Sequence, residues 1–240
     1  MIDDALRRRT GPLLERLGGR LHRAGVRPGW LTGSGFALGV GACAAAAGRS
    51  WPADLVLWLA NRALDGLDGA VARAGPGPTE RGALVDIVAD FSVYGGFVLA
   101  VGVAEPAARL ACLALLVAYY VSGTSFLALS SLLEKRGAAR DDERSLRFAG
   151  GLAEGAETVA VYVLVCLLPG RAGPIAWAFA AAVAVTALQR TWTGARLLGA
   201  PAPATKGRPG DRVVAEAHCP EEAPRVRPGV GGGAADWVAP

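Results

Sequence analysis

The strongest constraint on this chain is a series of six apolar segments, each close to the roughly 20 residues that an α-helix needs to cross a bilayer. They are residues 30–48, 52–73, 82–104, 107–133, 152–169 and 174–198. Of the 240 residues, 52% are hydrophobic and 19% are charged, a balance typical of a membrane protein. We therefore expect an all-α integral membrane protein with six transmembrane helices.

Four carboxylates lie within the second and third of these segments. On a helix, one face of the second segment carries Asp65, Asp68, Gly69, Ala72 and Arg73. One face of the third segment carries Gly82, Asp86 and Asp90. Residues 75–78 (Gly-Pro-Gly-Pro) break the helix between them. Two antiparallel helices joined by this tight turn would bring the two faces together and form a pocket of four carboxylates.

Such a pocket needs a positive partner, because four like charges at membrane depth repel one another and are costly to desolvate. Carboxylate oxygens suit hard divalent ions such as Mg²⁺ or Mn²⁺. Two such ions would neutralise the cluster and could bind a pyrophosphate. Gly69, Ala72 and Gly82 would let a bulky ligand approach the backbone, and Arg73 could pair with a phosphate.

The spacing of these residues resembles the signature of a known family. The pattern D-x-x-D-G-x-x-A-R, eight residues, then G-x-x-x-D-x-x-x-D, runs from Asp65 to Asp90 with no position missing. It is similar to the signature of the CDP-alcohol phosphatidyltransferases, also called CDP-alcohol phosphotransferases. Outside the signature the resemblance is architectural, a six-helix membrane domain after an N-terminal surface helix. The family transfers a substituted phosphate from a CDP-linked donor, CDP-diacylglycerol in the lipid-making branch, to an alcohol and releases CMP.

The resemblance also implies roles for individual residues. It implies two divalent cations, Mg²⁺ or Mn²⁺, at Asp65, Asp68, Asp86 and Asp90. It implies a CDP site at Gly69, Ala72, Arg73 and Gly82. Asp90 would also act as the general base that takes the proton of the acceptor hydroxyl. The partners implied are the CDP-linked lipid donor, an alcohol acceptor, membrane lipids and a second copy of the chain as a homodimer, with no nucleic acid.

Thr32 begins the first apolar segment, in the stretch Pro-Gly-Trp-Leu-Thr at residues 28–32. The family often has a P-N-x-L-T motif there that contributes to the nucleotide site, and Gly29 stands here in place of the Asn. Two interpretations of Thr32 are therefore open. It contributes to the CDP site, or it only caps the N-terminus of a helix.

The acceptor site is indicated by charged residues near the fourth, fifth and sixth segments. Glu154 and Glu157 begin the fifth segment. They either complement the helix dipole or line a site for a neutral polyol or a cationic amino alcohol. Lys135 belongs to a basic connection that either binds an acceptor phosphate or only follows the positive-inside rule. Arg190 in the sixth segment could also face the cavity.

The charge distribution predicts the topology and three parts of the chain. Basic residues gather before the first segment, between the fourth and fifth, and after the sixth. This alternation puts both termini and the carboxylate pocket on the cytoplasmic side of the inner membrane. Residues 1–27 are expected to form an amphipathic surface or juxtamembrane helix, residues 28–199 the catalytic membrane domain, and residues 200–240 a flexible cytoplasmic tail.

Three other interpretations compete with this one. An intramembrane prenyltransferase also binds diphosphate through metal-linked D-x-x-D clusters, but usually from two separated Asp-rich loops. A divalent-cation transporter could use the four carboxylates as its ion path. A structural membrane protein could pair them only with Arg62 and Arg73, although two arginines do not compensate four acids.

Overall fold

The structure is a computed structural model that describes residues 2–136 and 155–199, with side chains described from residue 11 onward. All of these residues belong to one unit of the chain, Met1–Ala202. Every regular element among them is helical, which confirms the expected all-α class for the described part. The α-helices are α1 (Ile2–Arg23), α2 (Pro28–Ala47), α3 (Trp51–Ala74), α4 (Glu80–Ala104), α5 (Arg109–Lys135), α7 (Gly155–Leu167) and α8 (Ala172–Gly199). Short 3₁₀ turns, Pro106–Ala108 and Pro169–Arg171, precede α5 and α8.

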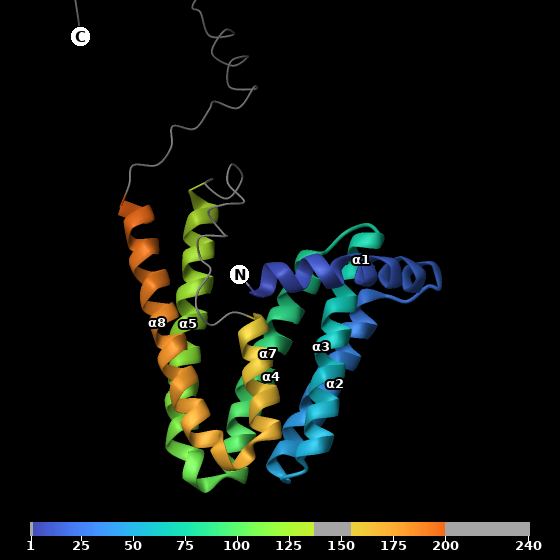
Figure 1. Ribbon diagram of the computed structural model, residues 1–240. Coiled ribbons are helices and arrows are strands. Elements are labelled where there is room, and N and C mark those ends of the chain that lie inside the picture. Colours follow the sequence, from blue (N-terminus) through green and yellow to red (C-terminus); the bar gives the residue numbers. More distant parts are fainter. Residues whose placement is uncertain (1, 137–154, 200–240) are drawn as a thin grey trace, which may run out of the picture. The chain divides into compact units, whose positions relative to one another are not determined.

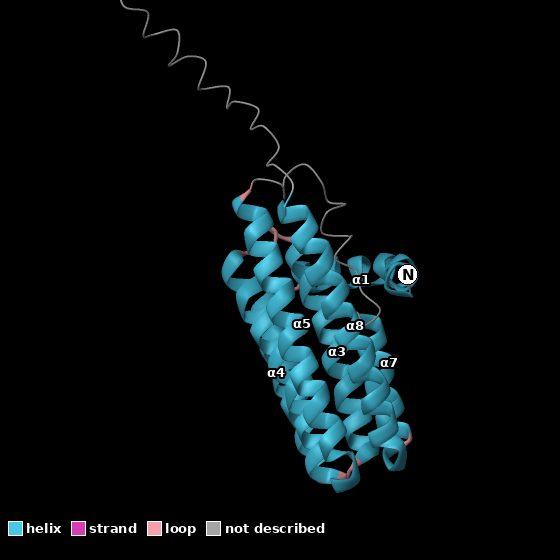
Figure 2. Ribbon diagram, turned by 90° about the vertical axis from the view of Figure 1, so that its left-hand side faces the viewer, coloured by secondary structure: helices cyan, strands magenta, loops and turns pink. Residues whose placement is uncertain are grey.

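The helices from α2 to α8 run side by side along one direction, and α1 crosses one end of this bundle (Figures 1 and 2). Helix α2 packs against α3 and α4, whereas α5 packs against α8. Helix α4 also contacts α5, and α7 contacts α3 and α8. The second and third apolar segments of the sequence, α3 and α4, therefore both pack against α2.

Four of the helical stretches are long and apolar enough to cross a membrane, among the residues described. They are Pro28–Ala47, Glu80–Ala104, Pro106–Lys135 and Pro169–Gly199. Helix α3 is long enough, with 24 residues, but it carries five charged side chains: Asp54, Arg62, Asp65, Asp68 and Arg73. The described part of α7 has only 13 residues.

An aromatic cluster fills the core beside the site-bearing halves of α3 and α4. Trp58, Phe97 and Tyr162 are each no more than 1% exposed. The rings of Phe97 and Tyr162 are stacked with centroids 4.0 Å apart, and Trp58 lies 4.8 Å from Tyr162. Burial of large aromatic rings is a major source of stabilisation, and offset or tilted pairs add to it. The cluster joins α3, α4 and α7 next to the carboxylates.

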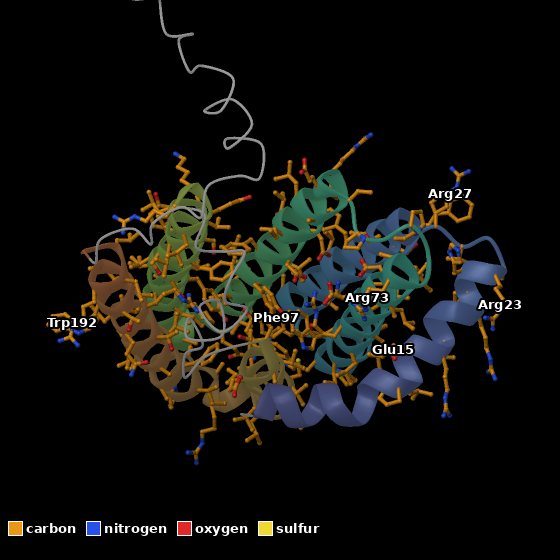
Figure 3. All side chains as sticks on the ribbon, turned by 90° about the horizontal axis from the view of Figure 1, so that it is seen from above. Glu15, Arg23, Arg27, Arg73, Phe97 and Trp192 are labelled. Carbon is orange, nitrogen blue, oxygen red and sulfur yellow. The ribbon has the colours of Figure 1, made fainter. Side chains whose placement is uncertain are left out.

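Small residues allow close contact where helices cross. A Cβ added to Gly39 of α2 would lie 2.5 Å from a methyl carbon of Val93 on α4. A Cβ added to Gly18 of α1 would lie 2.7 Å from the backbone carbonyl carbon of Ala70 on α3. The absence of side chains at these positions lets α2 approach α4 and lets α1 lie directly on α3. Seen along the bundle, Arg23 and Arg27 project outward from the end of α1 and the connection that follows it (Figure 3).

Candidate active site

The turn between α3 and α4 forms where the sequence predicts it. Helix α3 ends at Ala74 and α4 begins at Glu80. Gly77 has φ of 102°, a left-handed conformation that favours glycine. Thr79 caps α4, because its hydroxyl accepts a hydrogen bond of 3.1 Å from the backbone N–H of Gly82. The turn reverses the chain within a few residues, so the acidic faces of both helices lie at the same end of the bundle.

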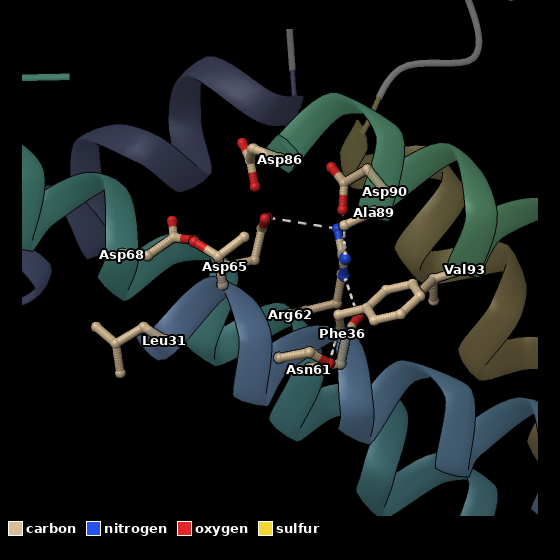
Figure 4. Close-up of a pocket in the computed structure, with 12 residues that line it drawn as sticks. Leu31, Phe36, Asn61, Arg62, Asp65, Asp68, Asp86, Ala89, Asp90 and Val93 are labelled. Atoms are coloured by element: carbon tan, nitrogen blue, oxygen red, sulfur yellow. Dashed lines mark hydrogen bonds and ion pairs between the residues drawn. The ribbon is translucent and has the colours of Figure 1, made fainter. Parts of the chain in front are cut away.

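The four carboxylates line one pocket between α2, α3 and α4 (Figure 4). Asp65, Asp68 and Asp86 each offer one oxygen, and these three oxygens lie within 4.8 Å of one another. Asp68 is the most buried, at 7% exposure. A divalent ion between such oxygens would have ligand distances near 2.0–2.6 Å, so the spacing fits a cation after small rotamer changes. The donor set is hard oxygen throughout, which suits Mg²⁺ or Mn²⁺.

Arg62 of α3 is the basic residue of this pocket. Its guanidinium forms ion pairs with Asp90, at 2.7 Å, and with Asp65, at 3.4 Å. The i, i+3 pairing with Asp65 follows from helical spacing, whereas the shorter pairing with Asp90 joins α3 to α4. Among the described residues, no basic side chain forms an ion pair with Asp68 or Asp86. Arginine pairing therefore accounts for only half of the acidic cluster, which weakens the purely structural interpretation.

Thr32 is not the N-cap of a helix, contrary to one of the two interpretations of the sequence. Arg27 is the N-cap of α2, with extended backbone angles, and Pro28 occupies the first helical position. Thr32 therefore lies one turn inside α2, where its Oγ1 is 2.7 Å from Oδ2 of Asp68 and 3.2 Å from the carbonyl oxygen of Pro28. The hydroxyl thus orients one of the candidate metal ligands.

Of the residues expected to contact CDP, Thr32 lines the pocket, whereas Gly69, Ala72, Arg73 and Gly82 do not. Gly69 and Ala72 are partly buried, whereas Arg73 and Gly82 are exposed. A Cβ on Gly69 would meet only the flexible end of Arg73, at 3.2 Å. A Cβ on Gly82 would meet the hydroxyl oxygen of Thr79 at 3.0 Å. The packing of the protein therefore does not by itself require glycine at position 69. A ligand close to the backbone is a sufficient reason for glycine there.

The residues expected at the acceptor site are spread over α5, α7 and α8. Lys135 is exposed in the last turn of α5. Arg190 of α8 donates hydrogen bonds to Oγ and the carbonyl oxygen of Ser122 on α5, at 3.2 and 3.3 Å. Glu157 lies in the first turn of α7, and its buried Oε2 has no hydrogen-bond partner among the described residues. Glu154 lies outside the described residues. None of the three described residues lines the carboxylate pocket.

The pocket also contains residues for which the sequence analysis predicted no role. Phe36 and Gly35 of α2 and Asn61 of α3 line it, and Tyr94 of α4 contacts Arg62 beside it. Asn61 donates a hydrogen bond of 2.8 Å to the carbonyl oxygen of Gly35. Asn61 stands in an otherwise apolar helical segment, one residue before Arg62. This is a signal in the sequence for a hydrogen-bonded position in the core, because buried amides are hydrogen-bonded in folded proteins.

Comparison with known proteins agrees with this arrangement. The chain is 40% identical over 200 residues to the inner membrane protein YnjF of Escherichia coli, an alignment that covers 81% of this chain and 95% of YnjF. Phosphatidylinositol phosphate synthase PgsA1 of Mycobacterium tuberculosis has a similar fold. Its structure with bound CDP-DAG matches with a TM-score of 0.57 at 20% identity, over 82% of this chain and 98% of PgsA1. Its complex with manganese and citrate matches with a TM-score of 0.60 at 23% identity, over 81% and 92%.

The profile of one protein family spans most of the helical unit. It is the family described as CDP-alcohol phosphatidyltransferase, and it matches residues 26–189. The matched range includes α2, α3, α4, α5 and α7 and most of α8, and therefore the whole carboxylate pocket. The chain therefore belongs to the CDP-alcohol phosphatidyltransferase family.

Proposed function

We propose that the chain transfers the phosphatidyl group of CDP-diacylglycerol to an alcohol and releases CMP, in a reaction of phospholipid biosynthesis that depends on two divalent cations, Mg²⁺ or Mn²⁺. Membership of the family makes the chain a phosphatidyltransferase. The observation that carries the proposal is the convergence of Asp65, Asp68 and Asp86, whose oxygens lie within 4.8 Å in one pocket. The CDP-DAG complex and the manganese complex of PgsA1 support the choice of donor and of metal.

The chemistry of the transfer assigns a role to each group of residues. The acceptor hydroxyl oxygen bonds to the phosphorus of the phosphatidyl group, while the bond from that phosphorus to the bridging oxygen of the pyrophosphate breaks. CMP leaves with the bridging oxygen, and the hydroxyl proton passes to Asp90. Asp65, Asp68 and Asp86 would hold the divalent cations, with Asp90 beside them, and the cations would supply charge neutralisation for the pyrophosphate and the leaving CMP. Thr32 holds Asp68 in orientation.

The donor and acceptor would approach from different parts of the bundle. Gly69, Ala72, Arg73 and Gly82 adjoin the carboxylates and would form the CMP site, with Arg73 free to swing toward a phosphate because its side chain is exposed. Glu157, Glu154, Lys135 and Arg190 are the candidates for the acceptor site. Within the described part of the chain the buried Oε2 of Glu157 has no hydrogen-bond partner, so a hydroxyl or ammonium donor on the acceptor would satisfy it.

The topology completes the proposal. Residues 28–199 would cross the inner membrane six times, with α3 and α7 as the two additional spans. Intramembrane charge is expected at a functional site, which explains why α3 is less apolar than its neighbours. Residues 1–27 would lie on the cytoplasmic surface as an amphipathic helix, and residues 200–240 would extend into the cytoplasm. Both termini and the site would then face the cytoplasm, where CMP is soluble. The chain would act as a homodimer.

The test is a turnover assay with the membrane-embedded protein. Membranes containing the protein are incubated with CDP-diacylglycerol and Mg²⁺ or Mn²⁺, and with inositol phosphate, glycerol phosphate, serine, choline or polyols in turn. We expect CMP release that requires both the metal and one acceptor, and the mass of the new lipid identifies that acceptor. Transport of divalent ions across vesicles without CMP release would instead indicate a transporter.

The role of Asp90 has its own test. Asp90→Asn should abolish turnover and leave CDP-diacylglycerol binding largely intact, because the carboxylate acts on the acceptor hydroxyl. Glu134→Gln is the matched control, since Glu134 is an exposed acid at the end of α5, outside the pocket. Equal loss of donor binding and turnover in Asp90→Asn would remove Asp90 as the base.

A further inference from the structure

Arg62 places one fixed positive charge inside the acidic pocket. Its Nη2 lies 2.7 Å from Oδ1 of Asp90, and its Nη1 lies 3.4 Å from Oδ2 of Asp65. The Arg62 side chain is only 12% exposed, whereas the two carboxylate side chains are 30% and 32% exposed. The Arg62 side chain is therefore more buried than either of the two carboxylates that it pairs with. It lies outside the D-x-x-D-G-x-x-A-R pattern, so the family signature assigns it nothing.

Contacts on several sides hold the guanidinium group of Arg62, so it does not move together with Asp65 or Asp90. Its Nε donates a hydrogen bond of 2.8 Å to Oδ1 of Asn61, and its Nη1 donates one of 2.8 Å to the hydroxyl of Tyr94. Its central carbon lies 5.1 Å from the ring of Trp58 and 5.0 Å from the ring of Tyr94. Cations at such distances from aromatic faces are attracted to them.

Two further hydrogen bonds connect the residues that hold Arg62 to α2 and α7. Asn61 donates to the carbonyl oxygen of Gly35 on α2, so the acceptor of the Nε bond is itself fixed. The backbone carbonyl of Tyr94 accepts a hydrogen bond of 2.9 Å from the buried hydroxyl of Tyr162 on α7. Because a planar guanidinium fork bonds in fixed directions, the immobile Arg62 determines where the more exposed carboxylate of Asp90 lies.

The position of Asp90 differs from that of the other three acids. Asp65, Asp68 and Asp86 form a set with mutually close oxygens, and among the described residues Asp90 does not join it. Figure 4 shows Asp90 beside Arg62, while Asp86 faces Asp65. We propose that Arg62 is a positioning residue that holds the Asp90 carboxylate apart from the other three, which keeps Asp90 available for the acceptor hydroxyl. This inference rests on the proposed function, in which Asp90 is the proton acceptor.

The proposal makes metal binding and turnover respond in opposite directions. In Arg62→Gln the fixed cation is gone and Asp90 is released toward the other carboxylates. A positive charge a few ångströms away opposes a divalent cation, and a fourth carboxylate attracts it. Affinity for Mn²⁺ should therefore rise by at least about tenfold. Turnover should fall by about a hundredfold, the contribution of a positioned general base, while KM for CDP-diacylglycerol changes little.

The experiment measures Mn²⁺ binding to the full-length protein in detergent, without substrate, by the electron paramagnetic resonance signal of free Mn²⁺. Arg62→Gln should bind more tightly, and adding Asp90→Asn should remove the gain. Arg49→Gln is the matched control, because Arg49 also forms a 2.8 Å ion pair, with Glu105, but outside the pocket. It should leave both Mn²⁺ affinity and kcat unchanged. Arg62→Lys should recover part of kcat, since it keeps the charge without the fork.

Several outcomes would overturn the proposal. Unchanged or weaker Mn²⁺ binding in Arg62→Gln contradicts it, as does a gain in affinity that persists after Asp90→Asn. If Arg62→Gln does not fold, Tyr94→Phe removes one hydrogen bond from the guanidinium and should shift affinity and kcat in the same directions by a smaller factor. Mn²⁺ binding needs no turnover, so it decides the role of Arg62 even if the wild-type protein releases no CMP, a result that would overturn the proposed function alone.

Discussion

The hydroxyl of Thr32 on α2 lies 2.7 Å from Oδ2 of Asp68 on α3, 36 residues further along the chain. Asp68 is 7% exposed and is the most buried of the four pocket carboxylates. A hydrogen bond to a buried carboxylate is charge-assisted and directional. Thr32 therefore fixes which oxygen of Asp68 is turned toward α2 and leaves the other for the pocket.

Replacement of Thr32 by Val should weaken metal-dependent activity. Valine has the shape of threonine but no hydroxyl, so Asp68 loses its partner and its fixed orientation. A hydrogen bond to a charged group contributes about 1.5–3 kcal/mol, which corresponds to at least about a tenfold change. We expect kcat/KM for CDP-diacylglycerol to fall by about that factor in a steady-state assay.

Thr32→Ser provides the control for shape and backbone. Serine keeps the hydroxyl, so activity should stay within about threefold of the wild type if the hydrogen bond is what matters. Loss of activity in Thr32→Ser as large as in Thr32→Val would show that the methyl group, and so the packing of α2, carries the effect instead.

Gly69→Ala should impair donor binding without impairing the fold. The added Cβ meets only the flexible end of Arg73, at 3.2 Å, so the protein itself accommodates it. A nucleotide close to the backbone at this position would be displaced by the methyl group. KM for CDP-diacylglycerol should rise by about tenfold while thermal stability stays equal or increases slightly, as expected for alanine in a helix.

Gly66→Ala is the matched control for Gly69→Ala. Gly66 lies on the same helix, and its added Cβ would make an ordinary contact of 3.5 Å with Leu14 of α1. KM should therefore remain that of the wild type. An equal rise in KM for both variants would place the effect in α3 as a whole and remove Gly69 from the CDP site.

Mn²⁺ should stabilise the protein against heat through the pocket acids. A ligand that binds only the folded state adds stability that grows with its concentration, by about 2.7 kcal/mol at a hundred times Kd. The apparent Tm should rise by several degrees with Mn²⁺, and Asp86→Asn should abolish most of that shift because it removes one of three converging ligands. Glu134→Gln should retain it. A full shift in Asp86→Asn would exclude Asp86 as a ligand.

The acidic faces could be predicted from the sequence because they depend only on helical periodicity and on one turn. Helical periodicity alone puts Asp65 with Asp68, and Asp86 with Asp90, on single faces. The Gly/Pro turn at residues 75–78 reverses the chain direction between the two helices, so their acidic faces lie at the same end. Nothing about side-chain rotamers or the rest of the bundle is needed, so these features of the structure agree with the sequence prediction.

Helical spacing accounts for the pairing of Arg62 with Asp65, but the pairing of Arg62 with Asp90 could not be predicted in the same way. The bond to Asp90 depends on how far α3 and α4 are shifted along each other, and the contact between Trp58 of α3 and Tyr94 of α4 accompanies that shift. Helical periodicity does not determine that shift.

The N-cap interpretation of Thr32 was wrong for a local reason. Pro28 occupies the first helical position, a placement that proline favours, so α2 begins one turn before Thr32.

Gly18→Ala should lower the stability of the protein, whereas Gly19→Ala should not. At Gly18 the added Cβ would lie 2.7 Å from the backbone of Ala70, which has no flexible end to move, so α1 must shift away from α3. Overpacking of this kind costs about 1–3 kcal/mol, and the apparent Tm should fall by about 5 °C. At Gly19 the nearest atom is the tip of Arg23, at 3.7 Å, so alanine should be neutral or slightly stabilising. Equal Tm values for both variants, measured by thermal unfolding in detergent, would show that α1 does not pack on α3 through Gly18.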